Sequence, residues 1–278
     1  MDQSLPAGLY IVATPIGNLG DMTSRAADTL RRADMILAED KRVTAKLLAH
    51  VGATAPMTSY NDHSDEKLRE RIVADLAHKA VALVSDAGTP LISDPGYKLV
   101  RAARNAGCEV HSLPGPCAAI AALTLSGLPT DRFLFIGFLP PKTKARASSI
   151  AEIAAVRATL IFYESGPRLA ECLAALLEGL GDREASVIRE ITKLHEEAVS
   201  GPLSKLAGRY AGSVPKGELV IIVGPPDREQ ASEEQLDEAL RQAMAKLSPS
   251  RAAAEVAARL AVPRRRAYAR ALELAGDN

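Results

Sequence analysis

Residues 80–96 read AVALVSDAGTPLISDPG, an unbroken apolar run followed by a glycine- and proline-rich loop that carries two aspartates. A short apolar run bounded by turn residues is typical of a strand that is buried on both faces of a sheet. Similar runs begin at residues 9 and 34, and segments with helical spacing of apolar residues follow at 24–32 and 67–78. This alternation predicts a parallel α/β sheet with helices on both faces.

A second group of strands and a helical tail follow this first sheet. Strands are predicted at 132–138, 158–163, 185–189 and 219–223, and helices at 144–156, 168–180 and 203–210. After the Gly224-Pro225-Pro226 break the pattern is helical, and Pro249 and Pro263 suit the first turns of two helices that meet at a tight turn. We therefore expect an N-terminal α/β domain at 1–114, a second α/β domain at 115–226 and a helical tail at 227–278.

The composition indicates a globular protein of two or more domains, because 278 residues with 47% hydrophobic side chains exceed one typical core. The longest apolar runs are far shorter than the roughly 20 residues that cross a bilayer, and the polar start MDQSLPAG does not resemble a signal peptide. Cys108, Cys117 and Cys172 are too widely spaced to suggest disulfides or a zinc site. We expect a cytoplasmic protein with no bound metal.

Charge is balanced over the chain, with 34 basic and 34 acidic side chains, but it is uneven in the tail. Residues 229–238 contain five acidic side chains and no Lys or Arg, whereas residues 249–274 contain six arginines and two glutamates. Two helices with a basic surface resemble a helix-turn-helix module, which lies along a nucleic-acid backbone. The same arginines also fit a solvated helix face. The absence of Trp argues against an aromatic base-stacking platform of the OB-fold or RNP type.

Nucleotide-binding motifs are weak or absent in this sequence. No G-x-x-x-x-G-K-[ST] string occurs, so a P-loop is excluded. Gly17 and Gly20, with Glu39 and Asp40 about 20 residues later, give an incomplete dinucleotide-binding pattern. Pro15 favours an extended, rigid loop over a phosphate-binding turn.

Three loops rich in Gly and Pro follow predicted strands: TPIG at 14–17, DAGTPLISDPG at 86–96 and PGP at 114–116. Ligands of open parallel sheets bind at the loops that follow the carboxyl ends of the strands. Glycine lets the backbone approach such a ligand closely, and proline stiffens the loop. Any one of these loops could be a simple tight turn, but three together favour a small-molecule site.

Eight motifs, in this order and spacing, resemble the bacterial ribosomal RNA small-subunit methyltransferase I family, which belongs to the tetrapyrrole methylase superfamily. The motifs are ATPIGNLGDMT, ILAEDKR, VSDAGTPLISDPG, LPGPCAAIAAL, FIGFLPPK, TLIFYESGPR, REITKLHEE and KGELVIIVG. The resemblance is dense over residues 8–226 and looser in the tail. It implies two α/β units with a cofactor cleft between them, S-adenosylmethionine as methyl donor, and a cytidine ribose 2′-oxygen of 16S rRNA as acceptor, in the free rRNA or the small ribosomal subunit. It also implies a homodimer.

Two motifs depart from the family pattern. The family usually has Glu-Asp-Thr-Arg where this chain has Glu39-Asp40-Lys41-Arg42, and Ser-Pro-His-Arg where it has Ser165-Gly166-Pro167-Arg168. Family roles for the third residue of the first motif, or for the histidine of the second, therefore do not transfer. Gly88-Thr89-Pro90 stands in place of the superfamily's Gly-Asp-Pro, which makes Asp86 or Asp94 a candidate for the missing carboxylate.

The resemblance also implies which residues form the walls of the cofactor cleft. They are Pro15, Ser85, Asp86, Ala87, Gly88, Thr89, Ile92, Cys117, Ala118, Tyr163 and Ile222.

Methyl transfer requires alignment of the acceptor oxygen with the methyl–sulfur bond and removal of the oxygen's proton. The candidate proton acceptors are Asp94, Asp40, Glu164, Glu190 and His63, with Asp94 and Asp40 ahead because both follow predicted strands. The cluster at 39–42 also fits an ion pair at a helix N-terminus.

Candidates for contact with RNA phosphates are Arg42, Lys142, Arg264, Arg265 and Arg266. Two other functions fit parts of the sequence. A C-methylase of a tetrapyrrole intermediate would share the cofactor cleft but would not need the basic tail. A non-catalytic nucleic-acid-binding regulator would use the tail but leave the strand-end loops without a role.

Overall fold

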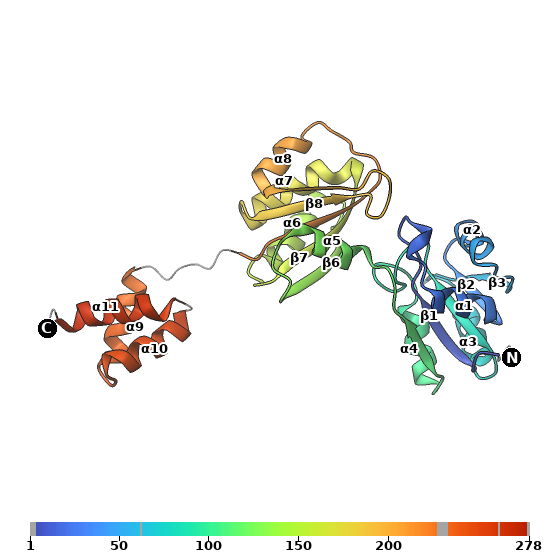
Figure 1. Cartoon of the computed structure of the whole chain (residues 1–278), viewed down its shortest axis with the longest axis horizontal. Helices are drawn as coiled ribbons and strands as arrows, with labels where there is room; N and C mark the ends of the chain where they lie inside the picture. The colour runs from blue at the N-terminus through green and yellow to red at the C-terminus, as the bar shows by residue number, and fades with distance from the viewer. Residues whose placement is uncertain (1–3, 62, 227–232, 261, 277–278) are drawn as a thin grey trace. The chain divides into compact units, whose positions relative to one another are not determined.

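The computed structural model describes residues 4–61, 63–226, 233–260 and 262–276. The chain divides into two compact units, Met1–Pro225 and Pro226–Asn278. Two five-stranded sheets make up most of the first unit, and helices make up the described part of the second (Figure 1). In the portions of the chain that are described, no helix has the length and apolar character needed to cross a membrane.

The first sheet has the strand order β3-β2-β4-β1-β5, and all of its pairs are parallel. Its strands are β1 (Gly8–Val12), β2 (Met35–Ala38), β3 (Met57–Ser59), β4 (Ala80–Val84) and β5 (Val110–Leu113). Its helices are η1 (Leu19–Asp21), α1 (Ser24–Arg32), α2 (Lys41–Val51), α3 (Glu66–Asp75) and α4 (Tyr97–Asn105). This sheet confirms the predicted parallel α/β arrangement.

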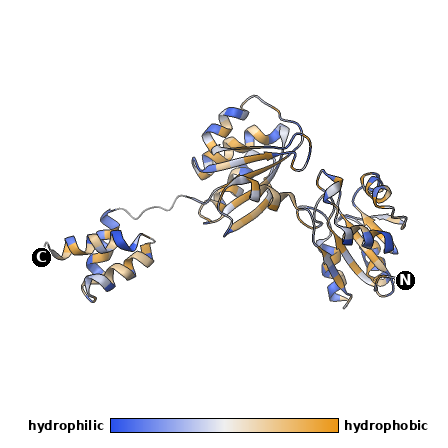
Figure 2. Ribbon diagram, in the orientation of Figure 1, coloured by the Kyte–Doolittle hydropathy of each residue, from blue (hydrophilic) through white to orange (hydrophobic). Residues whose placement is uncertain are grey.

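Both faces of the first sheet are buried. Tyr10 and Val12 of β1 pack with residues of α1 and α2 on one face, whereas Leu9 packs with α3 and α4 on the other. All five residues of β4 are buried, which explains why the strand is apolar at every position instead of every second one. Hydrophobic residues accordingly concentrate in the strands (Figure 2).

The second sheet has the order β6-β7-β10-β8-β9 and is mixed. Strands β6 and β7 pair in parallel, while β10 pairs antiparallel with β7 and β8, and β8 pairs antiparallel with β9. The elements are α5 (Ala118–Ser126), β6 (Phe133–Phe138), α6 (Thr143–Ile153), β7 (Thr159–Ser165), η2 (Gly166–Arg168), α7 (Leu169–Leu180), β8 (Glu184–Arg189), β9 (Glu197–Pro202), α8 (Leu203–Tyr210) and β10 (Glu218–Val223).

The two faces of the second sheet have different partners. Leu160 and Phe162 of β7 face a core formed with α6, α7 and α8. Ile161 and Tyr163 face α5 instead, in a smaller core that also contains Ile16, from the loop after β1. This smaller core therefore joins the two sheets of the first unit.

The tail unit contains α9 (Glu233–Met244), α10 (Pro249–Leu260) and α11 (Arg264–Gly276). Leu240, Val256 and Ala267, one from each helix, are fully buried in its core. Pro249 is the first residue of α10, and Pro263 immediately precedes α11. Both prolines thus stand at helix starts, as the sequence predicts.

Two strands are not predicted from the sequence. β3 has only three residues, too few to show a period. β9 alternates between half-buried and exposed residues over its first four positions and forms one edge of the second sheet. Neither segment shows the continuous apolar pattern that marks the central strands.

Candidate functional site

A pocket of about 410 Å³ lies in the first unit, at the loops that follow strands of both sheets. Pockets of this size hold small organic ligands. From the first sheet and the loops after it, the lining residues are Ile16, Glu39, Asp86, Ala87, Gly88, Thr89, Ile92, Ser93, Asp94, Cys117 and Ala118. From the second sheet and its loops they are Phe138, Tyr163, Glu164, Ser165, Ile191, Gly217, Glu218, Leu219 and Val220.

Hydrogen bonds join the three loops that the sequence singles out. The backbone N–H of Thr14 donates to the carbonyl of Gly88 over 2.8 Å, and that of Gly88 donates back to Thr14 over 3.1 Å. The Thr89 hydroxyl donates to the carbonyl of Pro116 over 2.9 Å. The loops at 14–17, 86–96 and 114–116 are therefore connected, and the first two contribute residues to the lining of the pocket.

Gly88 needs to be glycine for two reasons. Its φ is +80°, in the region that residues with a Cβ rarely adopt. A Cβ at this position would lie 3.2 Å from Cγ2 of Ile16 and 3.7 Å from the carbonyl of Pro116. A side chain at residue 88 would therefore be strained and crowded against Ile16 in the lining of the pocket.

The same loop holds two other residues at positive φ, Leu91 at 74° and Ser93 at 64°. Such conformations cost of order 1–3 kcal/mol each in residues other than glycine and cluster at functional sites. Ser93 lines the pocket, and its hydroxyl lies 2.8 Å from where a Cβ of Gly137 would be. This close approach brings the loop after β4 against the end of β6.

Carboxylates dominate the polar lining of the pocket. Glu39, Asp86 and Asp94 come from the loops after β2 and β4, and among the described lining residues none is Lys, Arg or His. Burial raises the pKa of Glu39, and the charges of Asp94 and Asp86 raise it further. Burial also raises the pKa of Asp94, opposed by a hydrogen bond with Ser85. A cationic ligand would relieve this repulsion, whereas a phosphate would increase it.

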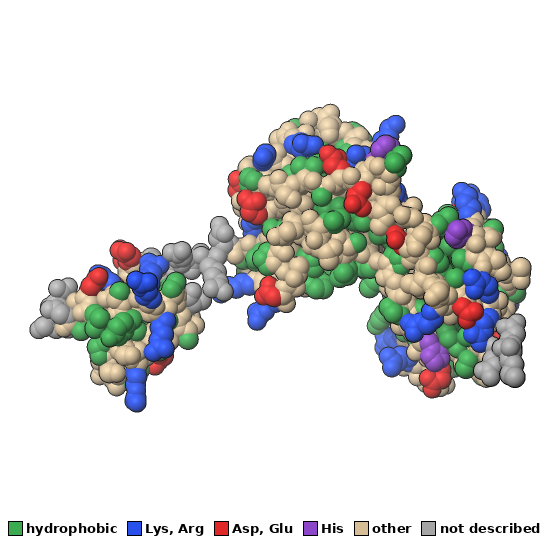
Figure 3. All heavy atoms as spheres, viewed as in Figure 1, with side chains coloured by type: hydrophobic (Ala, Val, Ile, Leu, Met, Phe, Trp, Pro, Cys, Tyr) green, Lys and Arg blue, Asp and Glu red, His purple; other side chains and the backbone are tan. Residues whose placement is uncertain are grey.

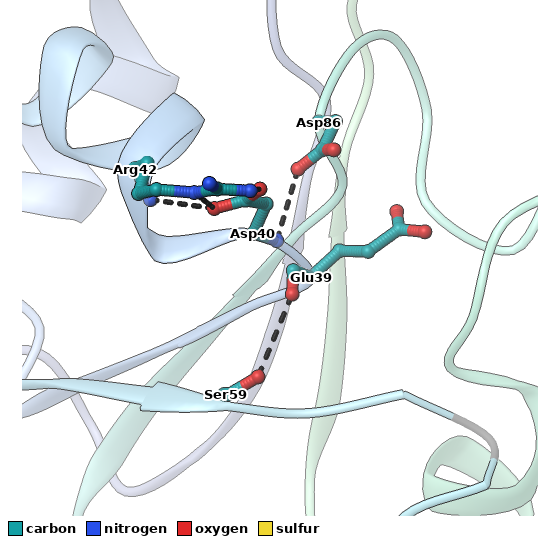
Figure 4. A network of polar contacts seen from close by, with 5 residues as sticks. All are labelled: Glu39, Asp40, Arg42, Ser59 and Asp86. Atoms are coloured by element: carbon teal, nitrogen blue, oxygen red, sulfur yellow. Dashed lines mark hydrogen bonds and ion pairs between the residues drawn. The ribbon is translucent and has the colours of Figure 1, made fainter.

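Asp40 lies beside this pocket but is not one of its lining residues (Figure 4). Its carboxylate accepts a hydrogen bond from the backbone N–H of Arg42, which caps α2, and pairs with the Arg42 guanidinium over 2.6 Å. The hydrogen bond from Arg42 lowers the pKa of Asp40 to about 2. This pairing makes Asp40 a weaker base than an aspartate of ordinary pKa, and its role as proton acceptor stays a prediction.

The carboxylate of Asp86 accepts a hydrogen bond from the Asp40 backbone N–H over 3.0 Å. Figure 4 shows the Glu39 side chain extending away from the Asp40–Arg42 pair. Adjacent residues at the end of β2 thus have different surroundings. Glu39 faces the pocket and Asp40 faces the start of α2.

Glu164 contributes to the lining, yet its side chain is fully buried and lies 3.4 Å from the Arg168 guanidinium. It also accepts a 2.8 Å hydrogen bond from the Ser165 backbone N–H. Successive side chains of a strand point to opposite faces, so Glu164 lies on the face of β7 opposite to Tyr163. These contacts hold the Glu164 carboxylate within the fold, and its role as proton acceptor stays a prediction.

Tyr163 is held rigidly at the pocket. Its hydroxyl accepts a 3.1 Å hydrogen bond from the Ala119 backbone N–H in the first turn of α5. Its ring makes edge-to-face contacts with Phe135 and Phe138, at centroid distances of 5.0 and 5.7 Å. Burial raises the pKa of Tyr163 above its ordinary value, so the phenol stays neutral at physiological pH.

Most of the predicted cofactor residues meet in this pocket. Those present in the lining are Asp86, Ala87, Gly88, Thr89, Ile92, Cys117, Ala118 and Tyr163. Pro15, Ser85 and Ile222 are not in the lining. Their places are taken by Ile16, by the residues after Ser85, and by Leu219 and Val220 nearer the start of β10. Ile222 is fully buried in the core against α5.

The other sequence candidates lie outside the lining. Glu190 pairs with Lys193 over 2.9 Å, which lowers its pKa, and His63 is exposed. Arg42, Lys142, Arg264 and Arg265 are exposed, and Arg266 is half-buried. Lys and Arg side chains are prominent on the visible face of the tail unit (Figure 3). Within the described ranges, no group of three or more His, Cys, Asp or Glu is arranged to hold a metal ion.

Sequence reasoning misses Glu39 and Phe138 as pocket residues. The sequence groups Glu39 with Asp40 in a charge cluster, and the position of Glu39 at the end of a strand is the available signal. Phe138 is part of the motif FIGFLPPK, but without the sheet nothing in the sequence places it at the pocket.

Two family profiles match this chain. Residues 8–207 match the Tetrapyrrole (Corrin/Porphyrin) Methylases, and residues 230–275 match the RsmI C-terminal HTH domain. The ribosomal RNA small subunit methyltransferase I of Erythrobacter litoralis is 56% identical over 98% of this chain and 97% of its own length. The protein of the same name from Escherichia coli O157:H7 is 44% identical over 96% of each chain.

Solved structures share the fold of the first unit at low sequence identity. The uroporphyrin-III-C-methyltransferase of Thermus thermophilus is 21% identical, with a TM-score of 0.56 over 78% of this chain and 94% of that one. A diphthine synthase is 14% identical, with a TM-score of 0.60 over 78% of this chain and 89% of that one. At these identities the likeness concerns the fold and not the substrate.

Proposed function

Because this chain belongs to the ribosomal RNA small subunit methyltransferase I family, within the tetrapyrrole methylases, we propose that it transfers a methyl group from S-adenosylmethionine to a cytidine ribose 2′-oxygen of 16S rRNA. The relatives carry this family name at 44–56% identity over nearly their full length. The tail belongs to the same proposal, since its helix-turn-helix profile is specific to this family.

The acidic pocket is the observation that carries the cofactor assignment. S-adenosylmethionine bears a positive sulfonium and an ammonium group, and it supplies an activated methyl group when bound. Glu39, Asp86 and Asp94 supply negative charge, with no basic side chain in the described lining to compete. The bare backbone at Gly88 leaves room for close approach of the ligand. These three carboxylates therefore fit a cationic ligand and would repel the pyrophosphate of a dinucleotide.

Asp94 is the proton acceptor in this proposal. It lines the pocket, and its raised pKa makes it a better base than an exposed aspartate. The Ser85 hydroxyl orients its carboxylate and favours the charged form that can accept the ribose proton. Glu39 and Asp86 hold the cationic groups of the cofactor, and the wall around Gly88 keeps the donor aligned with the acceptor oxygen.

RNA binding is assigned to cations outside the pocket, which are exposed except for the half-buried Arg266. Arg264, Arg265 and Arg266 begin α11, and Lys142 immediately precedes α6. Such side chains bind phosphates and position the RNA without reading its sequence. The family resemblance adds a homodimer that acts in the cytoplasm on the small ribosomal subunit or its RNA.

The test is methyl transfer from labelled S-adenosylmethionine to small ribosomal subunits that lack the modification, with free 16S rRNA and a uroporphyrinogen as parallel acceptors. We expect label in the RNA, recovered as 2′-O-methylcytidine after digestion to nucleosides. Label in the tetrapyrrole would support the C-methylase instead. Cofactor-independent binding of nucleic acid without any transfer would support the regulator.

A further inference from the structure

Phe138 is an exposed aromatic ring at the mouth of the pocket. It lines the pocket, and 57% of the residue is accessible to solvent. Ligand pockets are lined mainly by hydrophobic and aromatic side chains, so an exposed ring in this lining is available to a ligand. Cofactor binding and proton removal, as proposed above, depend on the carboxylates and the wall around Gly88 and do not involve this ring.

The backbone fixes the position of Phe138. The pairing of β6 with β7 shifts register between Phe135 and Gly137, and Gly137 has a φ of +74°. Such bulges redirect the side chains that follow them and occur next to active sites. On the other side, the carbonyl of Leu139 accepts a 2.7 Å hydrogen bond from the Arg168 guanidinium.

The ring is supported by an edge-to-face contact with Tyr163, while 57% of Phe138 stays accessible to solvent. Tyr163 is itself fixed by its hydrogen bond from Ala119. The loop after β4 approaches β6 where Ser93 meets Gly137. Ile92, the residue before Ser93, is also exposed at the pocket, with 37% of its surface accessible. An aromatic and a branched aliphatic side chain therefore flank the same mouth.

We propose that Phe138 stacks on the nucleobase of the nucleotide that accepts the methyl group, and so positions its ribose over the pocket. This inference rests on the proposed function and deepens it. Proteins that recognise RNA stack unpaired bases on aromatic side chains, so an exposed ring beside the pocket suits the base of the acceptor nucleotide. Phe138 is a positioning residue, since it contacts the base and not the reacting oxygen.

Charge and exposure favour a nucleobase over other occupants of this mouth. The nearby carboxylates repel a phosphate, whereas Lys142 and Lys144, a few residues beyond Phe138, are exposed and suit the flanking phosphates. The adenine of the cofactor has more enclosed apolar surface available at Ile16, Ile191 and Val220, all buried.

The test compares F138L, F138Y and F138W with the wild-type protein on unmodified small ribosomal subunits. Leucine keeps apolar volume but loses the π-face, so F138L should reduce kcat/KM roughly 5- to 100-fold, the range for loss of one stacking partner. Tyrosine and tryptophan should restore most of the rate. The salt dependence of subunit binding should not change, because the ring binds no phosphate.

Phe133 provides the matched control. It lies at the other end of β6, is 46% exposed, and is not among the lining residues of the pocket. F133L should therefore retain the wild-type kcat/KM. Equal rates for F138L and F133L, with the wild type active, would overturn the stacking role and leave the proposed function intact.

The chain contains no Trp, so F138W carries a single tryptophan fluorophore at the pocket mouth. Titration with S-adenosylmethionine should leave its emission close to that of F133W, and F138L should bind the cofactor with wild-type affinity. Strong quenching of F138W by the cofactor, or weakened cofactor binding by F138L, would assign the ring to adenine and overturn the proposal. A wild-type protein that methylates no RNA would instead overturn the proposed function.

Discussion

The pocket of the first unit and the helices of the tail use charge in opposite ways. In the pocket, Glu39 and Asp94 are partly buried near Asp86, and their mutual repulsion is retained in the structure. In the tail, Arg264 and Arg265 are exposed, where water and salt screen them. Partly buried charges act strongly on one small ligand, whereas exposed charges act weakly and additively on a large polyanion. Mutations should therefore have large, local effects in the pocket and small, salt-dependent effects in the tail.

The largest effect is expected at Gly88. G88V should abolish detectable S-adenosylmethionine binding in calorimetric titration, because the branched side chain would enter the space beside Ile16 that the ligand needs. The control is G107V, since Gly107 also has a positive φ, of 73°, but a Cβ there would meet no atom within 4 Å. If both variants lose binding equally, backbone strain and not crowding is the cause.

The next largest effect is expected when the proposed proton acceptor, Asp94, is replaced. D94N should reduce single-turnover methyl transfer at saturating cofactor roughly 10²- to 10⁴-fold, as expected for loss of a general base. The wild-type rate should fall as the pH decreases through the pKa of Asp94, which burial places above the ordinary 3.8. D94N should lack this acidic limb, because amides do not titrate.

D40N is the matched control for D94N, because the Asp40 carboxylate lies next to the pocket but has a pKa of about 2. Its rate and pH profile should stay close to those of the wild type, since asparagine still caps α2. A larger reduction in D40N than in D94N would restore Asp40 as the proton acceptor.

A smaller effect is expected in the tail. Replacing Arg264, Arg265 and Arg266 with Ala should weaken RNA binding and reduce the slope of log K against log salt by roughly 0.7–0.9 for each phosphate that the arginines neutralise. Cofactor affinity should be unchanged. Identical slopes for the triple variant and the wild type would give these arginines a structural role only.

The smallest effect should be a change in the pH dependence of tail stability. The Arg270 guanidinium binds the Asp237 carboxylate through two 2.6 Å hydrogen bonds, and this lowers the pKa of Asp237. A lowered pKa in the folded state stabilises the fold above the unfolded-state value near 3.8, and that stability is lost as the pH falls through the folded-state pKa.

D237N should therefore lower the thermal midpoint of the tail by a few degrees at pH 7, about the change that a destabilisation of order 1 kcal/mol produces in a small unit. The difference from the wild type should shrink as the pH falls below the unfolded-state value near 3.8. Hydrogen exchange of α9 and α11 in the full chain measures this difference in the stability of the tail. A pH-independent difference would mean that packing, and not the charge of Asp237, is responsible.

The sequence identifies the loops near the pocket more accurately than it identifies the individual residues that line it. Strand-end position and Gly-Pro content identify the loops at 14–17, 86–96 and 114–116, because these signals are local. The choice between neighbours is not predictable. Tyr163 and Glu164 differ in the face of β7 on which the side chain lies, and Glu39 and Asp40 differ in whether the side chain faces the pocket or the start of α2. That face depends on which helices cover the sheet, which is not a local property.

Prediction of the strands from local sequence has the same limit. The buried strand β4 is evident from its continuous apolar run, whereas the edge strand β9 is not, since half of its early positions face solvent. The bulge before Phe138 depends on the pairing of β6 with β7. Pairing between strands separated in sequence leaves little trace in either strand by itself.

The strand order of the second sheet has a consequence for synthesis of the protein. β10 is the last strand along the chain, yet it lies between β7 and β8 at the centre of the sheet. Until β10 has left the ribosomal exit tunnel, β7 and β8 each expose an unpaired apolar edge, and Leu219 and Val220 are missing from the pocket. The nascent chain therefore acquires a complete pocket only when translation of the first unit is essentially finished.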